Sequence, residues 1–235
     1  MCTVDPRYVR LPLDAQAIQA GWTHALRVNG PVRSDMAELL ALLQTVLSLP
    51  SPAYIDTAIA LDWYKRPDDA VDPLSWPNTE TGELVYRGKY VYRHYPEPQA
   101  QAGRELVRLL CDAVRQHPSL REATVVLDVP GHDSAQVSFG SRLAASVARV
   151  LRIPMVRTSA LARFRPPAKG IELAERRTAI EGRFVLESDL CSQRALIVDD
   201  VYRSGISMGE TGRAARAAGA VRVDGIVPVR TMRAR

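Results

Sequence analysis

The stretch at 194–229 constrains the fold most, because a strand pattern, a helix pattern and a second strand pattern follow one another there. Residues 195–198 are an uninterrupted apolar run, as expected of a strand buried on both faces. A helix of small residues is expected at 205–218, Gly219 marks its end, and 221–229 is again apolar. This order is typical of a parallel sheet covered by helices. We therefore predict an α/β protein with a doubly wound, mainly parallel sheet flanked by helices.

The rest of the chain supplies further elements of the same kind. Apolar residues at helical spacing predict helices at 36–47, at 106–114 and from 139 to 151. Apolar runs predict strands at 54–63, 124–129 and 154–156. The segment 84–92 is interpreted as a hairpin that turns at Arg87 and Gly88, after a proline-rich loop. We expect residues 1–98 to form a hood or acceptor-binding subdomain and residues 99–235 to form the core.

Composition limits the class of protein. The chain has 235 residues, 46% of them hydrophobic, which suffices for one domain with an appended piece. It shows no signal-peptide pattern and no run of eighteen apolar residues, so we expect a cytoplasmic protein without a membrane partner. The net charge of +5 suits an anionic ligand. A nucleic acid is not expected, because the basic residues are not interleaved with aromatic ones.

Two acids, Asp199 and Asp200, directly follow the apolar run at 195–198. In an open α/β sheet this is the carboxyl edge, where ligands bind. The next residues include a glycine and two hydroxyls and open a helix, whose first N–H groups favour an anion. We interpret this loop as a phosphate-binding segment, formed by Val201, Tyr202, Arg203, Ser204, Gly205, Ile206 and Ser207.

The two carboxylates would repel a phosphate, so they need other partners. Vicinal sugar hydroxyls or a divalent cation would supply them, and acids beside a phosphate loop therefore indicate a sugar phosphate. One alternative is an acidic strand end that only caps the next helix, although capping needs a single acid. Another is a receiver-type acidic pocket, in which the acid pair follows the first strand of the domain, whereas this pair follows a late one.

The segment ALIVDDVYRSGIS resembles the phosphoribosyl pyrophosphate (PRPP) signature of the type I phosphoribosyltransferases. That signature has four apolar residues, two acids and a Thr- and Gly-rich loop; here Arg203 stands for a usual Thr, and Ile206 for a small or basic residue. The resemblance implies that Asp199 and Asp200 grip the ribose 2- and 3-hydroxyls and that the loop amides hold the 5-phosphate. It also implies Mg²⁺, bound by the two acids directly or through the ribose hydroxyls.

The preceding segment RFRPPAKGIELAERRTAIEGRF is similar to the ComF-like branch of that family. Ala168, Lys169 and Ala179 stand where the branch has Gln, Thr and Asn. The resemblance implies a flexible loop that closes over the ligand, with Arg163 and Arg176 in catalysis and with Arg165, Lys169 and Arg177 on the pyrophosphate.

The family's pyrophosphate loop corresponds by position to the residues after the strand at 124–129. It would comprise Pro130, Gly131, His132, Asp133 and Ser134. For His132 the alternative is an ordinary hydrogen-bonded surface group. Asp128, just before them, would contact Mg²⁺ or anchor a loop amide.

The resemblance implies an enzyme in which a nitrogenous, base-like small-molecule acceptor displaces pyrophosphate from ribose C1 of Mg–PRPP. Two other functions stay open: a non-catalytic PRPP or nucleotide sensor, and a nucleotide phosphorolase or hydrolase. Four aromatic residues would stack an acceptor or pack in the core: Trp63, Tyr64, Tyr86 and Tyr90. Neither the acceptor nor the oligomeric state, with a homodimer among the options, is specified by the sequence.

Overall fold

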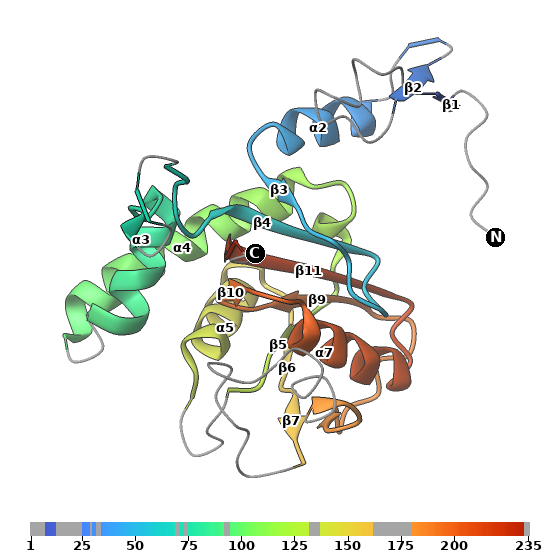
Figure 1. The fold of residues 1–235 in the computed structure, drawn as a ribbon. Coiled ribbons are helices and arrows are strands. Elements are labelled where there is room, and N and C mark those ends of the chain that lie inside the picture. The colour runs from blue at the N-terminus through green and yellow to red at the C-terminus, as the bar shows by residue number, and fades with distance from the viewer. Residues whose placement is uncertain are drawn as a thin grey trace.

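The computed structural model describes residues 8–12, 25–28, 30–31, 34–68, 71–72, 75–91, 95–131, 137–161 and 180–232. Its central feature is a seven-stranded sheet in the order β3-β4-β11-β9-β5-β6, with β10 paired to β11 (Figure 1). The strands of this sheet are β3 (Leu47–Ser48), β4 (Thr57–Trp63), β5 (Val125–Asp128), β6 (Met155–Val156), β9 (Arg194–Val198), β10 (Val201–Tyr202) and β11 (Arg222–Arg230). All pairings are parallel except that of β3 with β4. The predicted mainly parallel sheet is confirmed.

Helices cover both faces of the sheet. The described helices are α2 (Ser34–Leu43), which packs against α4, and α3 (Glu80–Tyr86), α4 (Pro96–Gln116), α5 (Phe139–Leu151) and α7 (Ile206–Ala217). Shorter elements are the π-helix η2 (Arg87–Val91) and the 3₁₀ helix η3 (Leu120–Glu122). Two further antiparallel pairs form two-stranded sheets, β1 (Tyr8–Leu11) with β2 (Ala25–Val28) and β7 (Ser159–Ala160) with β8 (Phe184–Val185).

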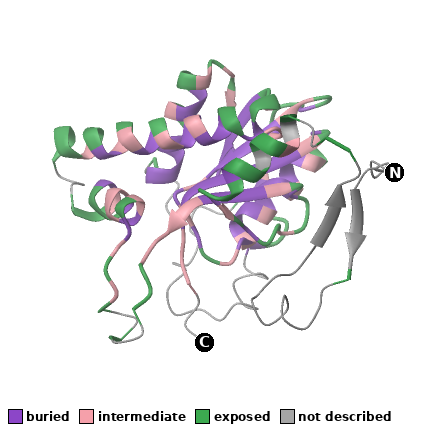
Figure 2. Ribbon diagram, turned by 90° about the horizontal axis from the view of Figure 1, so that it is seen from above, coloured by how far each residue is buried: buried purple, intermediate pink, exposed green. Residues whose placement is uncertain are grey.

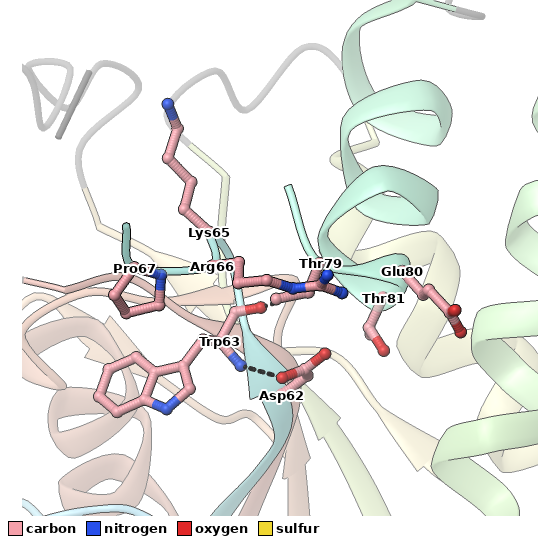
Figure 3. Close-up of a pocket in the computed structure, with 8 residues that line it drawn as sticks. All are labelled: Asp62, Trp63, Lys65, Arg66, Pro67, Thr79, Glu80 and Thr81. Atoms are coloured by element: carbon pink, nitrogen blue, oxygen red, sulfur yellow. Dashed lines mark hydrogen bonds between the residues drawn. The ribbon is translucent and has the colours of Figure 1, made fainter. Parts of the chain in front are cut away.

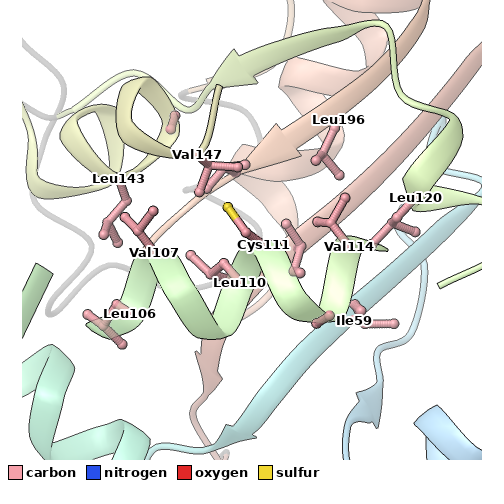
Figure 4. Packing of buried hydrophobic residues seen from close by; sticks show 14 of the residues in the cluster. Ile59, Leu106, Val107, Leu110, Cys111, Val114, Leu120, Leu143, Val147 and Leu196 are labelled. Carbon is pink, nitrogen blue, oxygen red and sulfur yellow. The ribbon is translucent and has the colours of Figure 1, made fainter. Parts of the chain in front are cut away.

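The hydrophobic core divides into two layers because side chains of a strand alternate between its faces. In β9, Leu196 and Val198 pack with α4 and α5, whereas Ala195 and Ile197 pack on the side of α7. Figure 4 shows α4 laying its apolar stripe on the first face, with Leu110 fully buried. The buried residues concentrate in the sheet and on the inner sides of the helices (Figure 2).

The sheet draws strands from both sides of residue 98. β4 lies within the expected hood region, yet it pairs with β11 over a register from Thr57 opposite Asp224 to Trp63 opposite Arg230. The segments 1–98 and 99–235 therefore share one sheet.

The hairpin predicted at 84–92 is wrong, because residues 84–91 are helical and belong to α3 and η2. Thr79 caps α3: its side chain accepts the Gly82 amide at 3.0 Å. The same hydroxyl donates to the Trp63 carbonyl at 2.6 Å, which joins the cap to the end of β4. A Thr followed by acids at Glu80 and Glu83 is the sequence signal for this helix start.

Candidate functional site

Asp199 and Asp200 lie in an interruption between two strands at the carboxyl edge of the sheet. β9 ends at Val198 and β10 begins at Val201, and both pair with β11. The acid pair thus has a paired strand on each side, which fixes its backbone. Asp200 is 9% exposed, so its carboxylate is largely removed from solvent.

The first turn of α5 approaches the acid pair closely. A Cβ added at Gly140 would lie 3.0 Å from Asp199 Oδ1 and 3.4 Å from the Asp200 amide nitrogen. The same Oδ1 atom accepts the Asp200 amide at 2.8 Å. Glycine therefore lets the helix N-terminus, which favours negative charge, come against Asp199.

Lys89 contacts the acid pair, although no motif in the sequence points to this residue. Its Nζ lies 2.8 Å from Asp200 Oδ2, with side-chain exposures of 30% and 13% for the two residues. Burial acts to lower the pKa of Lys89, but attraction and a hydrogen bond from Asp200, with the charges of Tyr90 and Asp199, leave that pKa above its ordinary value. The ammonium group is therefore charged at neutral pH.

Two of the aromatic residues singled out in the sequence, Tyr64 and Tyr90, lie near Lys89. Burial, then the neighbouring Tyr90, raises the pKa of Tyr64 to about 12, against the opposing charge of Lys89. Tyr86 and Tyr90 are 42% and 53% exposed, with ring centroids 5.9 Å apart. These two rings lie at the surface and not in the core.

The loop after the acids is held by Tyr202 and Gly205. The Tyr202 hydroxyl donates to the Pro50 carbonyl at 2.7 Å, and a Cβ at Gly205 would lie 2.5 Å from that hydroxyl. Gly205 has φ 75°, in the left-handed region, and forms the N-cap of α7. The loop therefore turns sharply into the helix.

The same loop has groups suited to an anion. Within the described part of the chain, the buried Ser204 hydroxyl has no hydrogen-bond partner. Ser207, in the first turn of α7, is 9% exposed. The first N–H groups of an α-helix lack partners within the helix, so hydroxyl and amide donors come together here. Arg203 is exposed.

The expected pyrophosphate-binding residues lie only partly in the described segments. Pro130 and Gly131 follow β5 at the same sheet edge and are half-buried. Asp128 is 3% exposed, and its Oδ1 accepts the Thr158 amide at 2.9 Å, so it anchors a loop amide. The other predicted residues lie outside the described residues: His132, Asp133, Ser134, Arg163, Arg165, Lys169, Arg176 and Arg177.

A cavity of about 290 Å³ opens at the carboxyl end of β4 (Figure 3). It is lined by Asp62, Trp63, Lys65, Arg66, Pro67, Thr79, Glu80 and Thr81. The Arg230 guanidinium, at the end of β11, lies 5.0 Å from the centroid of the Trp63 ring. Because β4, β11 and β9 are parallel, this cavity and the acid pair share one edge of the sheet.

The donor set around the acids does not fit a directly bound metal ion. No group of three or more His, Cys, Asp or Glu side chains is arranged for metal binding among the residues that the structure describes. Asp200 Oδ2 is engaged by an ammonium group and Asp199 Oδ1 by an amide.

No described helix has the length and apolarity needed to cross a membrane.

Solved structures similar to this chain include three phosphoribosyltransferases. The purine phosphoribosyltransferase of Pyrococcus horikoshii Ot3 is 16% identical, with 55% of this chain and 82% of that chain covered and a TM-score of 0.38. The orotate enzyme of Aeropyrum pernix is 23% identical, with 55% and 59% covered and a TM-score of 0.37. The adenine enzyme of Leishmania tarentolae is 12% identical, with 79% and 82% covered and a TM-score of 0.43.

Neither a family model nor a curated protein sequence matches this chain. All three TM-scores lie below 0.5.

Proposed function

We propose that this chain is a phosphoribosyltransferase of the ComF-like branch that binds Mg–PRPP and transfers its phosphoribosyl group to a nitrogenous small molecule. The observation that carries the proposal is that two fixed carboxylates are followed, at one sheet edge, by a loop that turns at Gly205. The buried Ser204 hydroxyl of this loop has no hydrogen-bond partner among the residues that the structure describes. Carboxylates accept sugar hydroxyls, and the loop donates to a phosphate. A phosphorylated pentose contains both groups.

The acids would hold the ribose while the loop holds its 5-phosphate. Asp199 and Asp200 are preceded by the buried strand β9, so the sugar is oriented by a rigid part of the molecule. Pyrophosphate leaves C1 with its bonding electrons, and the acceptor nitrogen then forms the new bond and loses its proton. The nearby carboxylates ease the positive charge that develops on the sugar ring.

Magnesium enters this proposal as part of the co-substrate, on the pyrophosphate of Mg–PRPP. It supplies charge neutralisation to the leaving group when bound. The chain's own cations for that group would be Arg163, Arg165, Lys169, Arg176 and Arg177, with the segment 130–134 beside it. Closure of the segment 163–177 would keep water from the reactive sugar.

The acceptor would bind on the side that residues 1–98 supply. Both the cavity at the end of β4 and the exposed rings of Tyr86 and Tyr90 come from this part of the chain. Exposed aromatic rings suit a planar, base-like acceptor.

The proposal is tested by PRPP binding and by turnover. Isothermal titration with PRPP and Mg²⁺ should show one site per chain, and a screen of nitrogenous acceptors should show pyrophosphate release. Asp200→Asn should lower turnover by at least about a hundredfold while the far-ultraviolet circular dichroism stays unchanged, because the hydroxyl acceptor is weakened. A folded Asp200→Asn protein with full activity would contradict the proposal. Tight binding without pyrophosphate release would identify a sensor.

A further inference from the structure

We propose that Lys89 is a built-in counter-ion of Asp200 that positions this carboxylate and occupies the place where a divalent cation would otherwise bind it. The inference rests on the proposed function in one respect, namely that Asp200 receives the ribose. Lys89 is thereby a positioning residue, since it acts on the ligand through Asp200.

The contact itself is close and sheltered. Lys89 Nζ lies 2.8 Å from Asp200 Oδ2, and the two side chains are only 30% and 13% exposed. Charges at this separation interact much more strongly when they are partly buried than at an open surface. Asp200 therefore does not present an uncompensated charge to a metal ion.

The backbone that carries Lys89 is fixed against the same site. η2 is a π-helical turn, a rare conformation that is frequent at functional sites. A Cβ at Gly88 would lie 2.8 Å from the ring of Phe139, the first residue of α5, and the Gly88 carbonyl accepts Gln99 Nε2 at 2.8 Å. Gly140, next to Phe139, lies against Asp199. One set of tight contacts thus places η2 and both acids together.

The surroundings of Lys89 leave the acid pair with a reduced negative charge. The groups that act on its ammonium are Asp200, Asp199 and Tyr90, whose ring centroid lies 5.7 Å from Nζ. Two carboxylates and one ammonium leave a formal charge of minus one. That charge still accepts hydroxyl hydrogens, but it attracts a divalent ion far less than two free carboxylates would.

The test measures the affinity of the full chain for Mn²⁺ in the absence of PRPP, with the water-proton relaxation rate as the readout. Lys89→Met keeps the apolar stem and removes the charge, so it should tighten Mn²⁺ binding by at least about tenfold. Lys89→Arg should resemble the wild type, and Lys89→Met with Asp200→Asn should lose the gain. Arg121→Met, which removes the cation of an exposed pair with Glu38, should change nothing.

Two results would overturn the inference. One is unchanged Mn²⁺ affinity in folded Lys89→Met. The other is tight Mn²⁺ binding by the wild type that Asp200→Asn abolishes, a comparison that needs no variant of Lys89. PRPP binding by the wild type is measured separately. Absence of PRPP binding would contradict the proposed function, whereas the Mn²⁺ affinities test the pairing of Lys89 with Asp200.

Discussion

Gly205 lies at a sharp turn of the loop after the acid pair, at a position that has no space for a side chain. Its φ of 75° and the Tyr202 hydroxyl, 2.5 Å from an added Cβ, leave no room for alanine. We expect Gly205→Ala to lower the free energy of unfolding by about 1–3 kcal/mol and to weaken PRPP binding. Gly103→Ala is the matched control, because Gly103 lies within α4 and no atom is near the added Cβ. This variant should raise the free energy of unfolding by about 0.5–1 kcal/mol. Chemical denaturation of both variants measures this.

We expect the stability of the protein to depend on pH through His117. It is 3% exposed, and its Nδ1 accepts the amides of Ser119 at 3.1 Å and Leu120 at 3.3 Å. Burial, then the charge of Arg222, lowers the pKa of His117, and Asp224 opposes them. The unfolded chain therefore binds the proton more readily, and stability is lost as the pH falls from about 6.5 through the lower folded-state value, by up to about 1.4 kcal/mol per pH unit.

The variant His117→Asn isolates this effect. Asparagine keeps an acceptor oxygen but does not titrate, so its free energy of unfolding should fall less than that of the wild type between pH 7 and pH 5. Parallel pH curves for the two proteins would show that His117 contributes nothing to the acid sensitivity.

The sequence predicted a site at the acids and the loop glycine but gave no signal for Lys89. Asp199, Asp200 and Gly205 occupy fixed offsets from a buried strand, so that prediction rests on a local pattern. Lys89 meets Asp200 only because α5 and η2 pack together, which no local pattern encodes.

Among the elements, α7 holds β8 by both backbone groups of Phe184. Glu210 accepts the Phe184 amide at 3.2 Å, and Arg213 donates to its carbonyl at 2.8 Å while pairing with Glu210. Glu210→Ala should cost about 1–3 kcal/mol in the free energy of unfolding, because it removes the carboxylate that accepts the buried Phe184 amide and pairs with Arg213. Glu105→Ala removes the glutamate of another i,i+3 pair, on the open surface of α4, and should have no measurable effect. Equal losses in urea melts would contradict this reading of the contact.

Element prediction succeeded where periodicity was strong. β9, α7, β11 and α5 lie within a residue or two of their predicted ranges, because buried strands and one-sided helices carry clear patterns. The hairpin prediction for 84–92 was wrong because apolar and polar residues alternate only weakly there and Gly88, at the centre, was interpreted as a turn residue. That glycine serves close packing against Phe139, not a turn.

Residues 1–98 and 99–235 contribute strands to the same sheet. We therefore expect that residues 99–235 do not fold alone. The 99–235 fragment lacks β4, so β11 loses the backbone hydrogen bonds that it makes with that strand. The fragment also lacks Ile59 and Val85, which belong to the hydrophobic core. The fragment should show no cooperative thermal transition. A chain that begins at residue 32 should keep one, because β1 and β2 pair only with each other among the described strands. Cooperative melting of the 99–235 fragment would make residue 98 a true domain boundary.

The bond between Lys89 and Asp200 joins residues from these two parts of the chain. The environment of Asp200, the acid proposed to receive the ribose, is therefore completed only when both parts of the chain have assembled. On the proposed function, a partly assembled chain would bind the sugar phosphate less tightly, and the ligand would stabilise the fully assembled form by mass action.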